Sequence, residues 1–196
     1  MSDPDQGAFA ARLDEVLVGG RESRLIEIVD YQPQWPQRFE AERVRIAAAL
    51  GSLARRIDHV GSTAVPGLAA KPIIDIQVSV DDPDDREPLV AALTGVGYLL
   101  RVREPDHLMF RTASLDVHVH CWRFGSADEQ RHLLLRDWLR SNSEDRALYE
   151  TKKRELAGRV WEDMNFYARA KTDTIEAILD RARGVRESDG GATGGS

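Results

Sequence analysis

Cysteine is almost absent from this chain of 196 residues, in which Cys121 is the only one. A single thiol cannot form an internal disulfide or a cysteine-rich zinc site, and it suits a reducing compartment, so the sequence predicts a cytoplasmic protein. Long apolar runs are also lacking, because no stretch approaches the roughly 20 residues that a membrane-spanning helix needs. The first residues show no basic region followed by an apolar run, so neither a signal peptide nor a membrane partner is expected.

Positive charge is in deficit. The chain holds 27 Lys and Arg residues against 33 Asp and Glu residues, which gives a formal net charge of −6. This balance leaves no broad basic surface for duplex nucleic acid, and we expect no such partner. A local basic pocket can still form on an acidic protein, so the expected partner is a nucleotide or another small anionic metabolite.

The length favours one folded domain with a sizeable core. We expect that domain over residues 25–183, with a sheet part at about 25–122 and a helical part at about 126–183. Residues 1–24 form an N-terminal extension, and the glycine-rich residues 184–196 are expected to be a disordered tail. This order predicts an α+β (α/β-like) fold, in which a sheet domain has a C-terminal helical subdomain packed on it.

Hydrophobic periodicity predicts the individual elements. Strands are expected at residues 25–29, 55–60, 72–80, 98–102, 108–112 and 115–121. Helices are expected at residues 8–17, 36–50 and 86–95, and in three further segments after residue 126, the last of them at about 166–182. The sequence Ser126-Ala-Asp-Glu129 has the form of a capping box, and Ser141-Asn-Ser-Glu144 is a candidate cap for the following helix.

The most informative pattern lies between residues 59 and 77. Gly61 and Ser62 close one apolar segment, and Asp75 stands inside a run of Ile and Val. A turn of small residues can wrap an anion with its backbone N–H groups. A carboxylate within an apolar strand is costly unless a metal, a proton or a partner meets it. The pattern predicts a phosphate-binding turn at Gly61, Ser62 and Thr63 beside a cation site.

Polar and apolar residues alternate in two of the predicted strands. The polar faces are Asp75, Gln77 and Ser79 in one strand, and Asp116, His118 and His120 in the other. Since side chains alternate between the two sides of a strand, these polar faces would meet if the strands were neighbours. We then expect Asp75, Gln77, Asp116, His118 and His120 to line one cleft.

Such a cleft could hold a divalent cation. Mg²⁺ prefers carboxylate and water oxygens and is often shared with substrate phosphates, whereas Zn²⁺ would prefer the histidines, with His59 as a third candidate. The alternative for each histidine is a hydrogen-bonded, partly exposed position. Asp116 could equally be a turn or edge residue, and Lys71 could neutralise a phosphate or be solvated.

The segment from His59 to Ile76 closely resembles the GrpB family, which is assigned to the nucleotidyltransferase superfamily. The likeness extends over about residues 25–182. It includes Val29-Asp30-Tyr31 with Pro33 and Trp35, His118-Val-His120, residues 131–140, Tyr149 with Lys153, and Tyr167 with Lys171.

The resemblance implies a nucleotidyltransferase-like fold, with a mixed β-sheet flanked by helices and with added C-terminal helices. In active members of that superfamily, a Gly-Ser pair holds the nucleotide phosphates, and an Asp-x-Asp/Glu pair with a third carboxylate binds Mg²⁺. Here Asp75 matches the first acid, Gln77 stands in place of the second, and the third falls near Asp116 or His118. The resemblance therefore implies Asp75, Asp116 and Gln77 as ligands of Mg²⁺ (or Mn²⁺), and Asp75, Asp116 and His118 as catalytic residues. Phosphate or substrate contacts are expected from Gly61, Ser62, Thr63, Lys71, His120, Lys153 and Lys171.

Three functions follow as hypotheses. The first is a Mg²⁺-dependent nucleotidyltransferase, with His118 or His120 binding substrate or acting as a base near neutral pH. The second is a binding protein that keeps the fold without the transfer reaction, which the uncharged Gln77 favours. The third and least favoured is a zinc- or manganese-dependent hydrolase. Similar domains occur fused behind dephospho-CoA kinases, but this sequence contains no Gly-x-x-x-x-Gly-Lys-Ser/Thr loop and predicts no kinase of that type.

Overall fold

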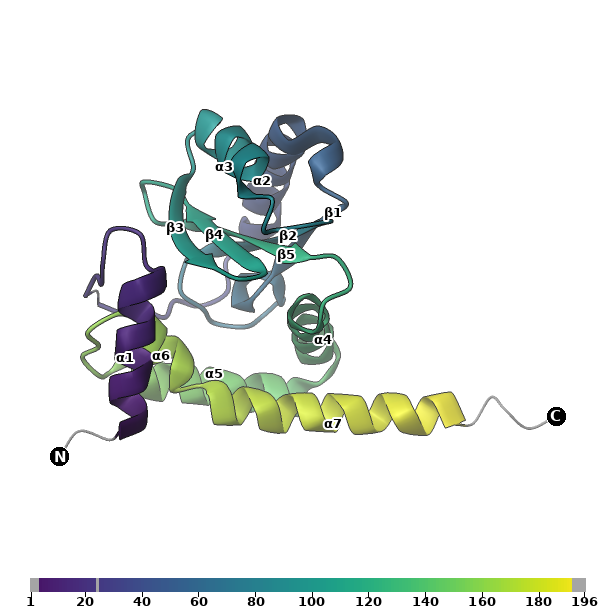
Figure 1. Cartoon of the computed structure of the whole chain (residues 1–196). Coiled ribbons are helices and arrows are strands. Elements are labelled where there is room, and N and C mark those ends of the chain that lie inside the picture. The colour runs from purple at the N-terminus through teal and green to yellow at the C-terminus, as the bar shows by residue number, and fades with distance from the viewer. Residues whose placement is uncertain (1–3, 24, 192–196) are drawn as a thin grey trace.

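A five-stranded mixed sheet organises the chain, with the strand order β1-β2-β5-β4-β3 (Figure 1). The structure is a computed structural model and describes residues 4–23 and 25–191. The strands are β1 (Arg56–Val60), β2 (Ile74–Val80), β3 (Leu99–Glu104), β4 (His107–Arg111) and β5 (Val117–Arg123). The central pair β2 and β5 is parallel, and the other three pairs are antiparallel.

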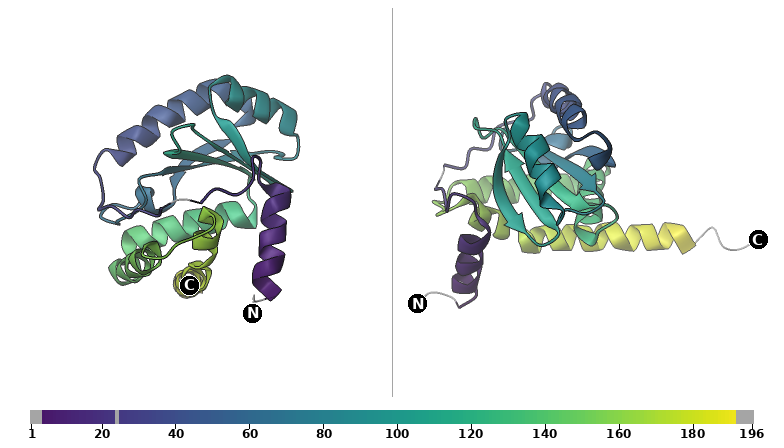
Figure 2. Two further views of the ribbon diagram at one scale, coloured as in Figure 1. Left: turned by 90° about the vertical axis from the view of Figure 1, so that its left-hand side faces the viewer. Right: turned by 45° about the horizontal axis from the view of Figure 1, so that its top comes forward.

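Helices cover both faces of this sheet. They are α1 (Pro4–Val16), α2 (Trp35–Leu50), α3 (Arg86–Gly95), α4 (Ala127–Ser141), α5 (Ser143–Ala157), α6 (Met164–Arg169) and α7 (Thr172–Gly191). Figure 2 shows α2 and α3 on one side of the sheet and the C-terminal helices on the other. The structure therefore confirms the predicted α+β class and the mixed, helix-flanked sheet. Among the residues described, none of these helices combines the length and apolar character that crossing a membrane demands.

The face of the sheet beneath α2 and α3 forms the main core. Ile74, Ile76 and Val78 of β2 point to this side and are fully buried, as are Phe110 and Cys121. Helix α2 contributes Trp35 and Ile46 to this core, and the segment that leads into β3 contributes Tyr98. Burial raises the pKa of the Cys121 thiol to about 12. The alternation predicted for residues 72–80 therefore places one complete apolar face in the core.

The opposite face of the sheet meets α4 through buried polar contacts. Ser126 caps this helix, since its side-chain oxygen accepts from the N–H of Glu129 at 3.3 Å. The Glu129 carboxylate does not complete the predicted capping box. It accepts from the Arg56 guanidinium at 2.8 Å, from the Gly125 N–H at 2.7 Å and from the Ser79 hydroxyl. One cap residue thus also ties α4 to β1 and β2.

Two element predictions are wrong. Residues 25–29 do not form a strand. Val29 makes only an isolated bridge with Ala70, which itself lies outside any strand. The helix predicted at 166–182 is two helices, which break at Ala170 and Lys171. The two halves serve different packing clusters, since Tyr167 packs in one and Ile178 in the other.

The first and last helices of the described chain are both longer than predicted. The helix predicted at residues 8–17 begins at Pro4. The last helix continues to Gly191, past the predicted start of a disordered tail at residue 184, and residues 192–196 lie outside the described part. Figure 1 shows the end of α7 extending beyond the body of the molecule.

Candidate functional site

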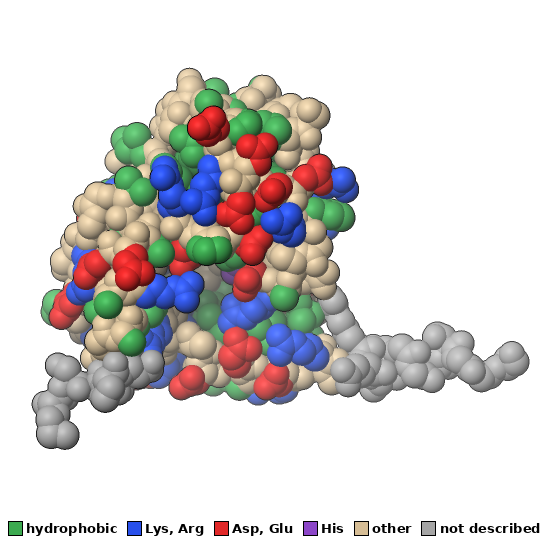
Figure 3. Space-filling model, viewed as in Figure 1, with side chains coloured by type: hydrophobic (Ala, Val, Ile, Leu, Met, Phe, Trp, Pro, Cys, Tyr) green, Lys and Arg blue, Asp and Glu red, His purple; other side chains and the backbone are tan. Residues whose placement is uncertain are grey.

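A cavity of about 310 Å³ lies on the polar side of the sheet. Its lining includes most of the residues singled out from the sequence, namely Gly61, Ser62, Thr63, Lys71, Asp75, His118, His120, Lys153 and Lys171. Residues from β2 and β5 therefore face residues from α5 and from the α6–α7 junction. On the face seen in Figure 3, acidic and basic side chains intermingle around a hollow in which a histidine is visible.

The register of the central strand pair brings the polar residues together. Asp75 lies opposite His118, and Gln77 lies opposite His120, in the parallel pair of β2 and β5. The two strands are therefore neighbours with their polar faces on the same side, as the alternation predicted. This pairing is the basis of the site, because it places a carboxylate and two imidazoles from strands 43 residues apart on one surface.

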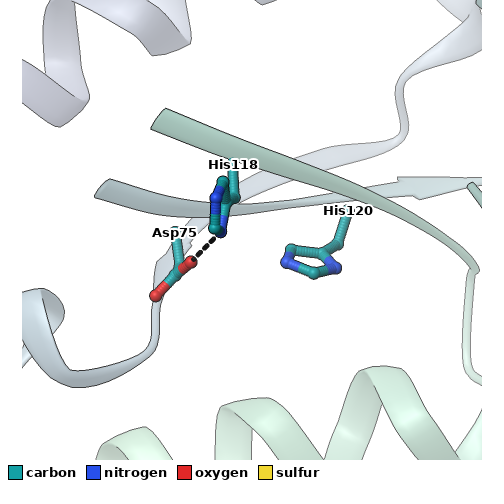
Figure 4. Close-up of side chains that lie close together, drawn as sticks. All are labelled: Asp75, His118 and His120. Atoms are coloured by element: carbon teal, nitrogen blue, oxygen red, sulfur yellow. Dashed lines mark ion pairs between the residues drawn. The ribbon is translucent and has the colours of Figure 1, made fainter. Parts of the chain in front are cut away.

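Asp75, His118 and His120 form a compact cluster (Figure 4). One ligand atom from each lies within 4.8 Å of the others, and the Nδ1 atom of His118 is 3.3 Å from the Oδ1 atom of Asp75. Burial alone would raise the pKa of Asp75. The hydrogen bond from His118 and the electrostatic influence of His118, His120 and Lys71 outweigh burial and lower this pKa to about 2. The carboxylate is consequently ionised near neutral pH.

Gly61 shapes the loop that presses against this carboxylate. Its φ angle of 68° lies in the left-handed region, which glycine adopts most readily. A Cβ atom at this position would lie 2.5 Å from the Oδ2 atom of Asp75. Only glycine therefore allows the turn to approach the acid this closely, which gives the Gly-Ser pattern a geometric reason.

His120 is held in place by a second histidine that the sequence analysis missed. The Nε2 atom of His107 lies 3.1 Å from the Nδ1 atom of His120, and the Nδ1 atom of His107 lies 3.0 Å from the Glu104 carboxylate. The His107 ring also stacks on Trp122, with ring centroids 3.8 Å apart. Burial and the neighbouring His107 lower the pKa of His120 well below its usual value, so the ring is neutral.

Three lysines line the other side of the cavity, around two tyrosine rings. The Nζ atoms of Lys71 and Lys171 lie 5.2 and 4.5 Å from the centre of the Tyr167 ring, and that of Lys153 lies 5.0 Å from the Tyr149 ring. Burial and the charge of Lys171 lower the pKa of Lys153 to about 7, and burial lowers that of Lys171 to about 8. The lowered pKa values show that the lysine charges lie close together and away from water.

The two tyrosines are buried and differ in their hydrogen bonding. The side chain of Tyr167 is fully buried, yet its hydroxyl has no hydrogen-bond partner among the described residues. Burial raises the pKa of Tyr149 to about 12, although a hydrogen bond with Ser62 opposes that rise. Tyr149 lies four positions before Lys153 in α5, and this spacing sets both side chains on one helical face, whereas Lys171 lies just past the end of α6, which contains Tyr167.

Two of the predicted metal ligands lie outside the Asp75 cluster. Asp116 precedes β5 at a turn, where its carboxylate accepts from Thr112 and Arg38, each at 2.7 Å. Gln77 is fully buried under α4, within hydrogen-bonding distance of the Glu129 carbonyl (3.3 Å) and of the Nδ1 atom of His132 (3.2 Å). Among the residues described, Asp75 is therefore the one carboxylate of the cluster.

This set of donors does not fit a pair of Mg²⁺ ions. Such a pair needs several carboxylate oxygens, because Mg²⁺ keeps octahedral oxygen coordination. The cluster supplies one carboxylate and two imidazoles. The roles of Asp116 and Gln77 as magnesium ligands stay predictions from the resemblance, and their present contacts give them no support.

The N-terminal segment supplies part of the cavity wall, which the sequence analysis did not predict. Leu17 forms a bridge with Val102 of β3, and both line the cavity. The carboxylate of Glu22 accepts two hydrogen bonds from Arg111, at 2.6 and 2.7 Å. No motif marks this contact, because its partners lie 89 residues apart in the chain.

Thr63 lines the cavity, and its hydroxyl contacts Ile73 and His59. This hydroxyl donates to the carbonyl of Ile73 at 3.0 Å and lies 3.0 Å from the Nε2 atom of His59. His59 stacks on Phe39 of α2, on the side of the sheet away from the cavity. His59 is therefore absent from the Asp75 cluster, and a zinc site that includes it is not supported.

Comparisons with known proteins agree with the architecture. The family model described as GrpB protein matches residues 25–181. A UPF0157 protein from Streptomyces coelicolor is 48% identical over 170 residues, which cover 87% of this chain and 91% of that protein. The crystal structure of the conserved protein GrpB from Enterococcus faecalis has a TM-score of 0.69 and 30% identity, covering 80% of this chain and 96% of that one.

A longer relative carries a different description. The dephospho-CoA kinase of Mycolicibacterium paratuberculosis is 31% identical over 195 residues, which cover 84% of this chain and 48% of the kinase. The chain therefore spans about half the length of that relative.

Proposed function

This chain belongs to the GrpB protein family, and we propose that its cavity binds the phosphate groups of a nucleotide or a related phosphorylated metabolite. The observation that carries this proposal is a pair of lysines in one cavity, the buried Lys153 and the partly buried Lys171. In the described part of the chain, Lys153 donates to the carbonyl of Ala69, and neither lysine forms an ion pair with a carboxylate. Buried charges need a counter-charge, which a bound phosphate would supply.

The rest of the cavity suits the same ligand. The unpartnered hydroxyl of Tyr167 can donate to a phosphate oxygen, and Ser62 lies on the opposite wall. The volume of about 310 Å³ is at the lower end of the range typical of small-molecule sites. A group of phosphate size fills only part of it, which leaves room for a nucleoside or another organic portion.

A nucleotide is the favoured organic portion on two grounds. The family resemblance implies a nucleotidyltransferase-like fold, and the matching segment also occurs in relatives described as dephospho-CoA kinases. Neither ground identifies the base or the sugar. The proposal is therefore for a phosphate-recognising cavity, with nucleoside triphosphates as the first ligands to test.

Direct binding measurements test this proposal. Calorimetric titration with pyrophosphate and with nucleoside triphosphates should show saturable binding that weakens at least about tenfold in Lys153→Met and Lys171→Met, since a hydrogen bond to a charged group contributes about 1.5–3 kcal/mol. The matched control is Lys152→Met, which removes a lysine from the outer side of the same helix, where it pairs with Glu155 at 3.3 Å. Unchanged affinity in the Lys153 and Lys171 variants, or no saturable binding of any phosphate compound, would refute the proposal.

Nucleotidyl transfer is the second candidate, and the close approach of Gly61 to Asp75 favours it. In that reaction an acceptor oxygen attacks the α-phosphorus of a nucleoside triphosphate and pyrophosphate leaves. The test is incubation of labelled nucleotides with a metabolite pool and either Mg²⁺ or Mn²⁺, followed by assay for pyrophosphate. If binding is saturable but no pyrophosphate forms, and Asp75→Asn changes nothing, the protein is a binding protein.

A further inference from the structure

We propose that Asp75, His118 and His120 bind a single divalent first-row metal ion of the kind that prefers imidazole, for which Zn²⁺ is the probe. This inference goes beyond phosphate binding, because the metal alone can occupy the cluster. It also departs from the Mg²⁺ pair that the family resemblance implies. It depends on the chemistry of the donors, on their spacing, and on the contacts that orient one of the imidazoles.

The donor chemistry favours a borderline ion over a hard one. Imidazole nitrogens suit zinc, iron, nickel and copper, whereas Mg²⁺ prefers oxygen ligands and binds imidazole poorly. The cluster offers two imidazoles and one carboxylate. Two histidines with one carboxylate are a recurrent donor set for Zn²⁺ and for non-haem iron, with further positions left to water or substrate.

The spacing of the donors also fits one ion. Two ligands at about 2.1 Å from a tetrahedral ion lie about 3.4 Å from each other. The observed distance between the Asp75 Oδ1 atom and the His118 Nδ1 atom is 3.3 Å. Figure 4 shows all three side chains directed into the same space beneath the sheet. A metal could therefore replace the proton shared by Asp75 and His118 without a large movement of either group.

The contacts of His120 leave one of its nitrogens available. The Nδ1 atom of His107 lies 3.0 Å from the Glu104 carboxylate, and the Nε2 atom of His107 lies 3.1 Å from the Nδ1 atom of His120. The Nδ1 side of the His120 ring is therefore occupied by His107, and Nε2 is the ring nitrogen that remains for a metal ion. Metal-binding histidines commonly donate their other N–H group to a fixed acceptor. His107 is a positioning residue, and its stacking on Trp122 fixes its ring.

The main experiment titrates metal-stripped, tag-free protein with Zn²⁺ and separately with Mg²⁺, without any nucleotide. We expect one equivalent of Zn²⁺ to bind, and Mg²⁺ at millimolar concentration to compete poorly. Co²⁺ as a second probe should give visible absorption bands that report nitrogen ligands. Because phosphate is absent, failure of this experiment and failure of the phosphate proposal are distinguishable.

Variants assign the ligands. Asp75→Asn and His120→Asn should each weaken Zn²⁺ binding at least about 100-fold, and the second change keeps a donor near the Nδ1 position for His107. His107→Phe keeps an aromatic ring on Trp122 but removes the side-chain contact with the Nδ1 atom of His120, and it should weaken binding about 10-fold or more. The Co²⁺ bands should change in His120→Asn.

Two controls define the result. His59→Gln changes a histidine on the other side of the sheet and should leave Zn²⁺ binding intact. Asp116→Asn removes the acid that the resemblance offered as a ligand and should also leave it intact. Far-UV circular dichroism and thermal unfolding establish that each variant is folded. No stoichiometric Zn²⁺ binding, stronger binding of Mg²⁺, or retention of Zn²⁺ in folded His120→Asn would overturn the proposal.

Discussion

The two faces of the central strand β2 have opposite characters, although their residues alternate along a single segment. Ile74, Ile76 and Val78 are fully buried against α2, α3 and the neighbouring apolar strands. Asp75 lies in a cavity wall beside imidazoles, and Gln77 forms polar contacts beneath α4. One face therefore contributes mainly to stability, and the other carries the ionisable groups.

This difference shows how a small domain can combine a stable core with a costly polar site. Burial of apolar side chains stabilises the fold, whereas the buried Lys153 and the Asp75 carboxylate are tolerated at a cost in folding free energy. Because the side chains of β2 alternate, the two roles share one backbone and do not compete for the same positions. Three predictions test this division, and the first has the largest expected effect.

Truncation on the apolar face should be far more destabilising than truncation on the cavity face. Phe110→Ala removes a fully buried ring and should lower the free energy of unfolding by about 3–5 kcal/mol. The matched variant is Met109→Ala, which changes the adjacent residue of β4 on the cavity side and should cost less, because that side chain already borders open space. Chemical denaturation measures both, and an equal loss would contradict the division.

Substitution of Gly61 should disturb the polar face from within its loop. Gly61→Ala forces a Cβ atom against the Asp75 carboxylate at a positive φ angle, so we expect a loss of about 1–3 kcal/mol and weaker binding of phosphate and Zn²⁺. Gly67→Ala is the control, since Gly67 has a φ angle of 77° but nothing within 4 Å of its added Cβ. Equal effects at the two glycines would show that contact with Asp75 has no importance.

The smallest effect is expected in the pH dependence of stability without ligand. The pKa of Lys153 is about 7 in the folded state against an ordinary value of 10.5, so the unfolded chain binds more protons above neutral pH. The destabilisation from this buried charge is complete below pH 7 and is relieved as the pH rises. Stability should therefore increase by about 1 kcal/mol per pH unit between pH 7 and 9 from this group.

Comparison with Lys153→Met isolates that slope. Lys171, whose pKa is lowered to about 8 by burial, titrates in the same window and is common to both proteins. The wild type should gain stability relative to Lys153→Met as the pH rises from 7 to 9 in urea denaturation experiments. Parallel curves would mean that Lys153 is not buried in its charged form.

Much of the fold could be predicted from the sequence because alternation and capping are local signals. Residues 72–80 read as a strand with one apolar and one polar face, and Ser126 read as a helix cap. The helix predicted at 166–182 failed because no local residue signals its break, which follows from packing in two separate clusters. Residues 25–29 had the composition of a strand but lacked a neighbouring strand to pair with.

The candidate site was predicted in part for the same reason. Asp75, His118 and His120 share a surface because their strands are neighbours, an arrangement that alternation suggested. The prediction placed Asp116 within a strand and in the cleft. It lies instead before β5, because Leu115 has a φ angle of 64° and the chain turns there. The contact of His107 with His120 arises only when β4 and β5 pair, so no local pattern could have indicated it.

The wall supplied by Leu17 and Glu22 has a consequence for how ligand preference can change. Both residues precede position 25, where the family match begins, yet they border the same cavity as the lysines and histidines. Exchange of this segment would alter that wall and the pairing of Arg111 while the sheet and its strand register stay as they are. A chimaera carrying the corresponding segment of a relative could therefore acquire a new selectivity without redesign of the sheet.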